Sequence, residues 1–184
     1  MAHRYADRHA LDGLIPASSG RRAADHLEIV YRVSVAVVLS VPGHEIDAAT
    51  LLVSESEVSV RIAGPGEWLA VSLELTPDGL RAALSADLGD AAHIIDQSHG
   101  RALLRLSGPN ARRILAKGVG VDLALEAFSE GHSANVLCGH IATNLACVGP
   151  DTFELLVMRS FAESLYEDLK LMGRAHGLSV AFSA

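Results

Sequence analysis

The chain has 184 residues, which is enough for one well-packed domain. Hydrophobic residues make up 49% of it and charged residues 20%, a balance that excludes an intrinsically disordered protein. Its formal net charge of −7 opposes the phosphate neutralisation on which nucleic-acid binding depends, so we expect no nucleic-acid partner.

The N-terminal third predicts an arm followed by strands. The first 26 residues lack clear periodicity, and we interpret residues 1–26 as an extended arm whose ordering a partner could provide. Residues 27–184 then form one domain. The β-branched run over 27–41, which stops at Pro42-Gly43, predicts one long buried strand. Val58, Val60 and Ile62 alternate with Ser59 and Arg61, the pattern of a half-buried strand.

A helix and three more strands follow this first group. The turn at 64–66 leads into a strand over 67–73. Thr76 as N-cap and Pro77 at the first helical position predict a helix that ends at Gly89. Its apolar face repeats every four residues, at Leu80, Leu84 and Leu88. Strands are predicted over 91–96 and 101–106.

The second half of the chain predicts a short helix, three strands, a long helix and a closing strand. Pro109 begins the short helix, which ends at Gly118 and places Ile114 and Leu115 inward. The three strands occupy 135–157, with turn regions at Asn144 and at Gly149-Pro150. Ser160 and Glu163 have the spacing of a capping box at the start of the last helix. The apolar face of that helix and the closing strand contain Phe161, Leu165, Leu169, Met172, Leu178, Val180 and Phe182.

An internal repeat links the two halves of the domain. The dipeptide Gly64-Pro65 recurs as Gly149-Pro150, and the offset that superimposes the two copies also aligns four further apolar positions. The aligned pairs are Trp68 with Phe153, Leu80 with Leu165, Leu84 with Leu169, and Ile95 with Val180. The sequence therefore predicts a single α+β domain with a mostly antiparallel sheet and an internally duplicated strand–helix–strand unit. A chance match of two apolar patterns is the alternative.

Few residues point to chemistry. No glycine-rich phosphate loop and no G-x-S-x-G motif occurs. Asp96, His99 and Arg101 could form a hydrogen-bonded cluster, but we favour a role for Asp96 and Ser98 in satisfying backbone groups at a strand end. His93, His99, His132 and His140 lack metal-site spacing, and Cys138-Gly139-His140 would place its two side chains on one strand face. We expect no catalytic, cofactor-binding or metal-ligating residues.

The N-terminal residues and the cysteines indicate the cellular compartment. The first 16 residues carry charges throughout and do not resemble a secretory signal, and the longest apolar stretch, 33–41, is too short to span a bilayer. Cys138 and Cys147 could face each other across a hairpin, but buried, reduced thiols are the simpler interpretation. We expect a soluble, cytoplasmic protein with no membrane partner.

Several ordered motifs resemble those of a known family over residues 64–172. They are Gly64-Pro65-Gly66-Glu67-Trp68-Leu69; Asp96-Gln97-Ser98 and, after a strand, Ser107-Gly108-Pro109-Asn110-Ala111-Arg112-Arg113-Ile114-Leu115; Lys117-Gly118 with Asp122-Leu123; and Phe153-Glu154-Leu155-Leu156-Val157-x-Arg159-Ser160-Phe161-Ala162. In this order they resemble the sarcosine oxidase gamma subunit family. More distantly, they are similar to the glycine-cleavage aminomethyltransferase (T-protein) family.

The resemblance implies an aminomethyltransferase folate-binding-domain-like fold and a place in a heterotetramer with alpha, beta and delta subunits. Such a complex demethylates sarcosine oxidatively to glycine and passes the one-carbon unit to tetrahydrofolate. Flavins, NAD, folate and zinc are expected on the partner subunits, and none on this chain, whose role would be assembly. Val119 stands where many relatives have cysteine, which argues against a redox role for that loop.

Two functions of different classes follow. A non-catalytic binding subunit predicts an exposed apolar surface on the isolated chain. A stand-alone folate-binding one-carbon (aminomethyl) transferase predicts a deep pocket with convergent polar groups and an acidic residue. No segment resembles the N-x-x-x-D stretch of the aminomethyltransferase, so we favour the binding subunit.

Overall fold

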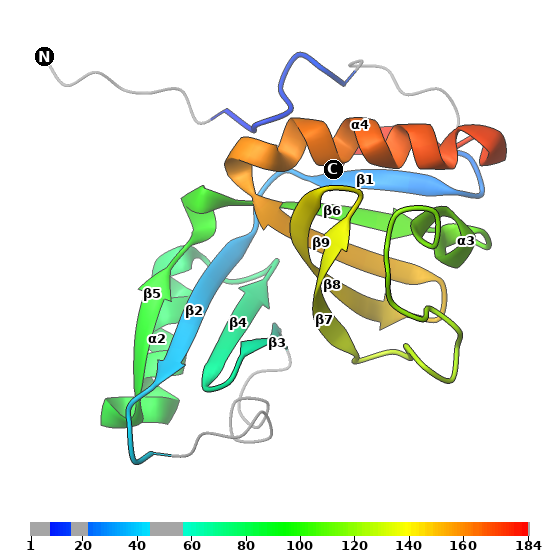
Figure 1. Ribbon diagram of the computed structural model, residues 1–184. Helices are drawn as coiled ribbons and strands as arrows, with labels where there is room; N and C mark the ends of the chain where they lie inside the picture. The colour runs from blue at the N-terminus through cyan, green and yellow to red at the C-terminus, as the bar shows by residue number, and fades with distance from the viewer. Residues whose placement is uncertain (1–7, 16–21, 45–56, 184) are drawn as a thin grey trace, which may run out of the picture.

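Two β-sheets face each other, and one helix packs on the outer face of each (Figure 1). The computed structural model describes residues 8–15, 22–44 and 57–183. The larger sheet has six strands in the order β10 (Ser179–Phe182), β1 (His26–Val30), β6 (Arg101–Ser107), β9 (Thr152–Met158), β8 (Ile141–Gly149) and β7 (Ser133–Cys138). The smaller sheet has the order β3 (Val58–Gly64), β4 (Glu67–Ser72), β2 (Ser34–Ser40) and β5 (Ala92–Asp96).

Helix α2 (Pro77–Leu88) covers the smaller sheet and α4 (Ala162–Gly173) the larger one, while the short α3 (Ala111–Leu115) packs beside α4. Each pair of neighbouring strands in the described chain is antiparallel except β1 and β10, which are parallel. The α+β class and the mostly antiparallel sheet are therefore confirmed.

The core has three apolar layers. One lies between the larger sheet and α4, and a second lies between the smaller sheet and α2, where Leu80, Leu84 and Leu88 are buried as predicted. The third layer fills the space between the two sheets. It consists of Val30, Val35, Val37, Leu69, Val71, Leu103 and Leu156.

The predicted duplication is present. Applying the offset between the two Gly-Pro pairs to α2 gives 162–173, which are the bounds of α4, and applying it to β4 gives 152–157, which lies within β9. The sheet orders also correspond, because β3-β4-β2-β5 matches β8-β9-β6-β10 once β1 and the edge strand β7 are removed. Strand β1 is thus inserted between two strands of the second unit, where the first unit has a direct pairing of β2 with β5.

The single strand predicted over 27–41 is wrong. The run divides into β1 in the larger sheet and β2 in the smaller one, with residues 31–33 crossing between them. A continuous β-branched run has the same composition whether it stays in one sheet or passes to the next, because both strands are buried on each face.

Three local predictions also differ from the structure. The capping box is absent: a 3₁₀ turn, η3 (Arg159–Phe161), precedes α4, and no side chain of the described residues caps the helix. Phe161 is 54% exposed, so the helix packs through Leu165 and Leu169 instead. Asn144 lies inside β8, and the turn between β7 and β8 is at Gly139, whose φ of 61° suits a residue without a Cβ. By contrast, Thr76 caps α2 as predicted, accepting a bond from the Gly79 N–H at 3.2 Å.

Part of the predicted N-terminal arm lies outside the described residues. Within 8–15 the chain forms a turn that buries Leu11 in the core cluster to which the larger sheet and α4 also contribute. His9 packs its ring against Tyr31 and Phe182, with centroids 6.0 and 5.4 Å away, and its Nδ1 accepts a bond from the Leu11 N–H at 3.1 Å. This contact attaches the segment to β1 and β10.

Acidification is expected to loosen the 8–15 segment. Burial lowers the pKa of His9 from its usual 6.5, Arg159 adds to that shift, and Asp12 opposes it. A depressed pKa means that the folded state favours neutral imidazole, so this stabilisation is present above pH 6.5 and is lost as the pH falls below it. As the pH falls from about 7.5 to about 5, we expect the protection factor of the Leu11 amide to decrease, once its exchange rate is corrected for the intrinsic pH dependence of amide exchange.

The His9→Asn variant, which keeps an acceptor near the Leu11 N–H, should show a weaker pH dependence of that protection factor. His140→Asn, at an exposed position, should retain the wild-type dependence. His26 also has a lowered pKa, so some global loss of stability in acid should remain in both variants. An unchanged Leu11 protection factor across this range would contradict the assignment.

Candidate functional site

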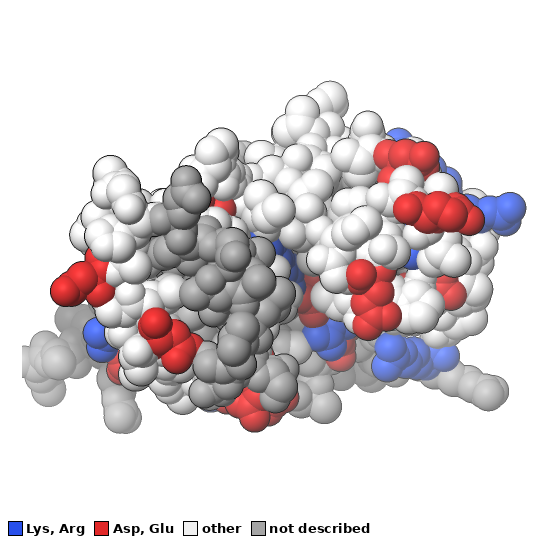
Figure 2. Space-filling view, turned by 90° about the horizontal axis from the view of Figure 1, so that it is seen from below, with Lys and Arg blue, Asp and Glu red and all other residues white. Residues whose placement is uncertain are grey.

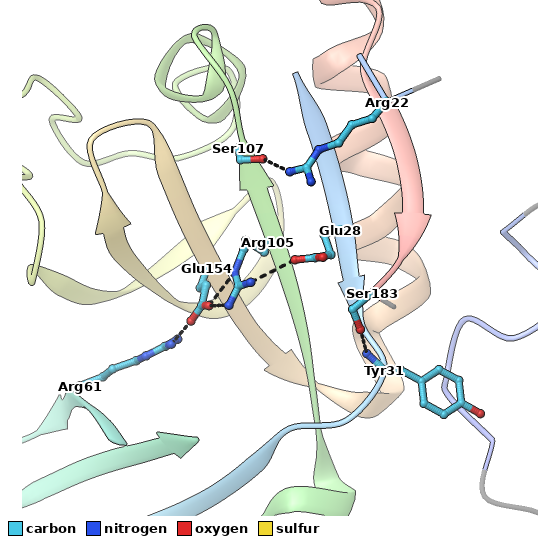
Figure 3. A network of polar contacts seen from close by, with 8 residues as sticks. All are labelled: Arg22, Glu28, Tyr31, Arg61, Arg105, Ser107, Glu154 and Ser183. Carbon is cyan, nitrogen blue, oxygen red and sulfur yellow. Dashed lines mark hydrogen bonds and ion pairs between the residues drawn. The ribbon is translucent and has the colours of Figure 1, made fainter. Parts of the chain in front are cut away.

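A network of four charged side chains occupies the space between the two sheets (Figure 3). Arg61 reaches from β3 to pair with Glu154 on β9, and its side chain is 1% exposed. Glu154 also accepts bonds from Arg105 Nε at 3.0 Å and Arg105 Nη2 at 2.6 Å. Arg105 Nη1 in turn donates to Glu28 at 3.1 Å. The network therefore joins three strands of the larger sheet to one of the smaller.

Strand register explains the three members on the larger sheet. Glu28 pairs with Arg105 across β1 and β6, and Arg105 pairs with Glu154 across β6 and β9. Because the side chains of directly opposed residues lie on one face of a sheet, Glu28, Arg105 and Glu154 lie side by side. The half-buried pattern predicted for this strand places Arg61 on its polar face. In the structure, Arg61 is instead among the largest fully buried side chains. One sequence feature could have indicated a buried ion pair: Glu154 lies within a buried strand, where a carboxylate requires a cationic partner.

The network neutralises its own charges. Burial lowers the pKa of Arg61, and Glu154 opposes this shift, so the guanidinium depends on that carboxylate. Both carboxylate oxygens of Glu154 are already bound by arginines. A carboxylate held in this way is a poor general base, because its acceptor sites are not directed at a substrate proton. The geometry suits a structural connection between the sheets.

A groove of about 560 Å³ opens where the inter-sheet space meets the surface. We call it the Arg101 groove. The smaller sheet supplies Ala63, Glu67 and Leu69, while the larger sheet supplies Arg101, Asn135, Val136, Leu137, Ala142, Thr143, Asn144 and Met158. Arg101 and Met158 are directly paired across β6 and β9. The groove is thus the open end of the apolar layer between the sheets.

Two further grooves lie elsewhere on the described surface. One, of about 450 Å³, is lined by Glu28 and Arg105, where the ionic network approaches solvent. The other, of about 470 Å³, is lined by Ser98 and His99. In the described chain no hydrogen bond joins the suggested cluster of Asp96, His99 and Arg101. His99 is near enough to Asp96 to help lower its pKa, whereas Arg101 and His99 line different grooves.

Asp96 and Ser98 hold the end of a strand, as favoured from the sequence. Asp96 Oδ1 accepts bonds from the Ser98 N–H at 2.9 Å and from its hydroxyl at 2.6 Å, and these bonds lower the pKa of Asp96. Ser98 Oγ accepts a bond from the Val35 N–H at 3.0 Å. The pair thus attaches the start of β6 to β2.

The cysteines and histidines do not converge. Cys138 and Cys147 are free, buried thiols that do not pair across β7 and β8. Burial, with a smaller contribution from Asp168, raises the pKa of Cys138 to about 11. His140 is exposed beyond the Gly139 turn, so it does not share a strand face with Cys138 as predicted. No group of three potential metal ligands occurs within the described ranges.

The motif over 107–110 has a structural explanation. Gly108 has a φ of 130°, and a Cβ there would lie 2.3 Å from the Ala24 carbonyl oxygen. The Asp25 carboxylate accepts bonds from the Asn110 N–H and from its side-chain amide, both at 2.8 Å. The motif therefore fixes the segment before β1 against the turn between β6 and α3.

Comparison with known proteins places these features in context. The model of the sarcosine oxidase, gamma subunit family matches residues 25–173. The gamma subunit of sarcosine oxidase from Corynebacterium sp. strain P-1 is 35% identical over 103 residues, which cover 54% of this chain and 49% of that protein. The Arthrobacter sp. gamma subunit is 34% identical over 101 residues, with the same coverage. The chain thus spans about half the length of the curated relatives it matches.

Solved structures show the same fold. Heterotetrameric sarcosine oxidase from Corynebacterium sp. U-96 contains a chain that matches 91% of this one over 95% of its own length, with a TM-score of 0.70 and 25% identity. The glycine cleavage system aminomethyltransferase T from Bartonella henselae matches 88% of this chain over 48% of its own, with a TM-score of 0.58 and 19% identity. The second likeness concerns the fold alone. Among the described residues, every helix is too short or too polar to cross a membrane.

Proposed function

The chain belongs to the sarcosine oxidase gamma subunit family, and from this membership we propose that it acts as the non-catalytic gamma subunit of a heterotetrameric sarcosine oxidase. The observation that carries the proposal is the family match over residues 25–173, with a chain of a heterotetrameric sarcosine oxidase matching 91% of this one. Its partners would be alpha, beta and delta subunits. Residues 27–184 would serve as one aminomethyltransferase-like domain after the N-terminal arm.

The complex would demethylate sarcosine to glycine in the cytoplasm and pass the one-carbon unit to tetrahydrofolate. Flavins, NAD, folate and zinc would reside on the partner subunits, and this chain would contribute to assembly. The state of its buried acid supports that division: Glu154 is engaged by Arg61 and Arg105 and cannot readily accept a substrate proton.

The alternative function, a stand-alone folate-binding one-carbon transferase, draws support from the likeness to aminomethyltransferase T. That likeness concerns the fold, and a fold hosts many functions. The alternative requires a polar pocket with an acid directed at the ligand. The groove of about 560 Å³ has six apolar and five polar lining residues, and its acid, Glu67, shares the groove with the cation Arg101, whose charge it partly compensates.

Affinity purification of the tagged chain from its native host tests the proposal. The expected product is a yellow complex of four different subunits that oxidises sarcosine and releases hydrogen peroxide. Deleting the gene for this chain should reduce recovery of the assembled complex. If the chain instead purifies alone and binds tetrahydrofolate tightly, the proposal is wrong and the alternative is supported.

A further inference from the structure

The Arg101 groove has the composition of a protein docking surface. We infer that it receives an apolar segment of another subunit, and that this segment carries a carboxylate that binds Arg101. The inference rests on the proposed function, because it assigns a partner to one surface of the assembly subunit. The occupant is specified by three features of the groove: its apolar floor and rim, a cationic donor and an acceptor, both unpaired within the described chain.

The apolar part continues the layer between the sheets. Leu69 belongs to that buried layer and also lines the groove, so the layer reaches the surface here. Leu137 is 60% exposed and Met158 is 43% exposed, and both line the same groove. Covering them would remove apolar surface from water, which favours association. A segment with aliphatic or aromatic side chains fits this floor and rim.

The polar part specifies a carboxylate. Among the described residues, Arg101 Nε is buried and lacks a hydrogen-bond partner, and no ion pair joins this guanidinium to Glu67 across the groove. Burial lowers the pKa of Arg101 while Glu67 opposes that shift, so the cation is only partly compensated. A guanidinium with an open donor binds carboxylates in a planar, directional geometry. An incoming Asp or Glu would supply the missing acceptor.

A second unpaired group lies on the same wall. Asn144 is 3% exposed, and its amide nitrogen donates to Ile62 O at 3.1 Å and to Asn135 Oδ1 at 2.8 Å. Its Oδ1 has no donor in the part of the chain that the structure describes, although buried polar atoms are nearly always satisfied. Because this oxygen is buried, a backbone N–H of the docked segment would reach it once the Asn144 side chain turns toward the groove. One charged and one neutral contact would then flank the apolar floor and fix the direction of the segment.

The charges of the groove itself are few, because Arg101 and Glu67 are its only charged lining residues. On the face seen from below, charges of both signs are scattered among uncharged residues, without a large patch of one sign on its described part (Figure 2). We therefore base recognition at the groove on individual groups. Arg101 is the cation that lines the groove, and its position between apolar side chains gives the ion pair a partly desolvated environment.

Site-specific photocrosslinking in the assembled complex tests the occupant. A photoreactive amino acid at Leu137 should attach to another subunit, at a peptide that contains Asp or Glu beside apolar residues. Attachment to a second copy of this chain, to a peptide without an acid, or to nothing would overturn the inference. Wild-type chain provides the reference, because its failure to co-purify with partners would contradict the proposed function instead.

Substitutions then test the chemistry. Arg101→Gln and Leu137→Asp should each weaken association with the partner subunits about tenfold or more, with unchanged circular dichroism and melting temperature. Leu171→Asp is the matched control, because Leu171 is 69% exposed on α4, away from the groove. Arg101→Glu should be rescued by changing the crosslinked acid of the partner to Lys. Wild-type association of both groove variants, or no rescue, would overturn the inference while leaving the proposed function intact.

Discussion

Replacing Glu154 with Gln is expected to destabilise the protein by about 3–5 kcal/mol, more than replacing Arg61 with Met. The two side chains form one ion pair, but they differ in what remains after each change. Without the Glu154 carboxylate, Arg61 stays buried at 1% exposure, with no other anion of the described chain in contact. Without Arg61, Glu154 still binds Arg105 through two bonds. The unequal losses follow from the unequal number of partners.

Chemical denaturation with urea measures both free energies of unfolding, and the order of the two values is the test. Met fills much of the volume of Arg61 and needs no acceptor, so Arg61→Met should cost less than the Glu154 variant and lie near the wild-type value. The exposed pair of Arg81 with Asp78 provides the control, and Asp78→Asn should change little. Equal losses for the two buried variants would show that Arg105 does not support Glu154.

Replacing Gly108 with Ala is expected to destabilise the protein by about 3 kcal/mol or more. Two costs combine at this position. A φ of 130° is unfavourable for any residue with a Cβ, and that Cβ would meet Ala24 O at 2.3 Å and Asp25 Oδ1 at 2.6 Å. The backbone of residues 24–25 would have to move away from the turn. This displacement would weaken the bonds from Asn110 to Asp25 and the docking of β1.

Gly131 separates the two costs. Its φ is 86°, but a Cβ there would have open space around it. Gly131→Ala should therefore cost about 1 kcal/mol, the backbone term alone. Thermal and urea unfolding of both variants give the comparison. If the Gly108 variant lost no more stability than the Gly131 variant, the close approach to Ala24 would have no energetic weight.

Local patterns predicted much of this fold. The Thr76-Pro77 start, the leucine stripe of α2 and the constant offset between the two Gly-Pro turns can each be recognised along the chain, and all three are found in the structure. The capping box failed because Ser160 falls within a 3₁₀ turn, where its spacing to Glu163 no longer serves a helix start. Short spacings predict elements well but do not determine the geometry of the residues around them.

Such short-range patterns could not predict the candidate site. Arg61 and Glu154 are far apart in the sequence and lie in different sheets, so no spacing relates them. The Arg101 groove likewise combines the 63–69 hairpin with β6, β7, β8 and β9. Arg101 is close to Asp96 and His99 in the sequence, but in the structure Arg101 and His99 line different grooves. Long-range assembly of the two sheets determines the site.

The inserted strand β1 has a consequence for the order in which the chain can fold. It pairs with β6, which follows only after the whole smaller sheet, and with β10, where His26 lies opposite Ser179. During synthesis, β1 emerges early but lacks its β10 neighbour until residues 179–182 have been made. Pairings between such distant segments form slowly, since a long loop must close first. The larger sheet should therefore complete late, and β1, α4 and β10 should gain their protection together in refolding.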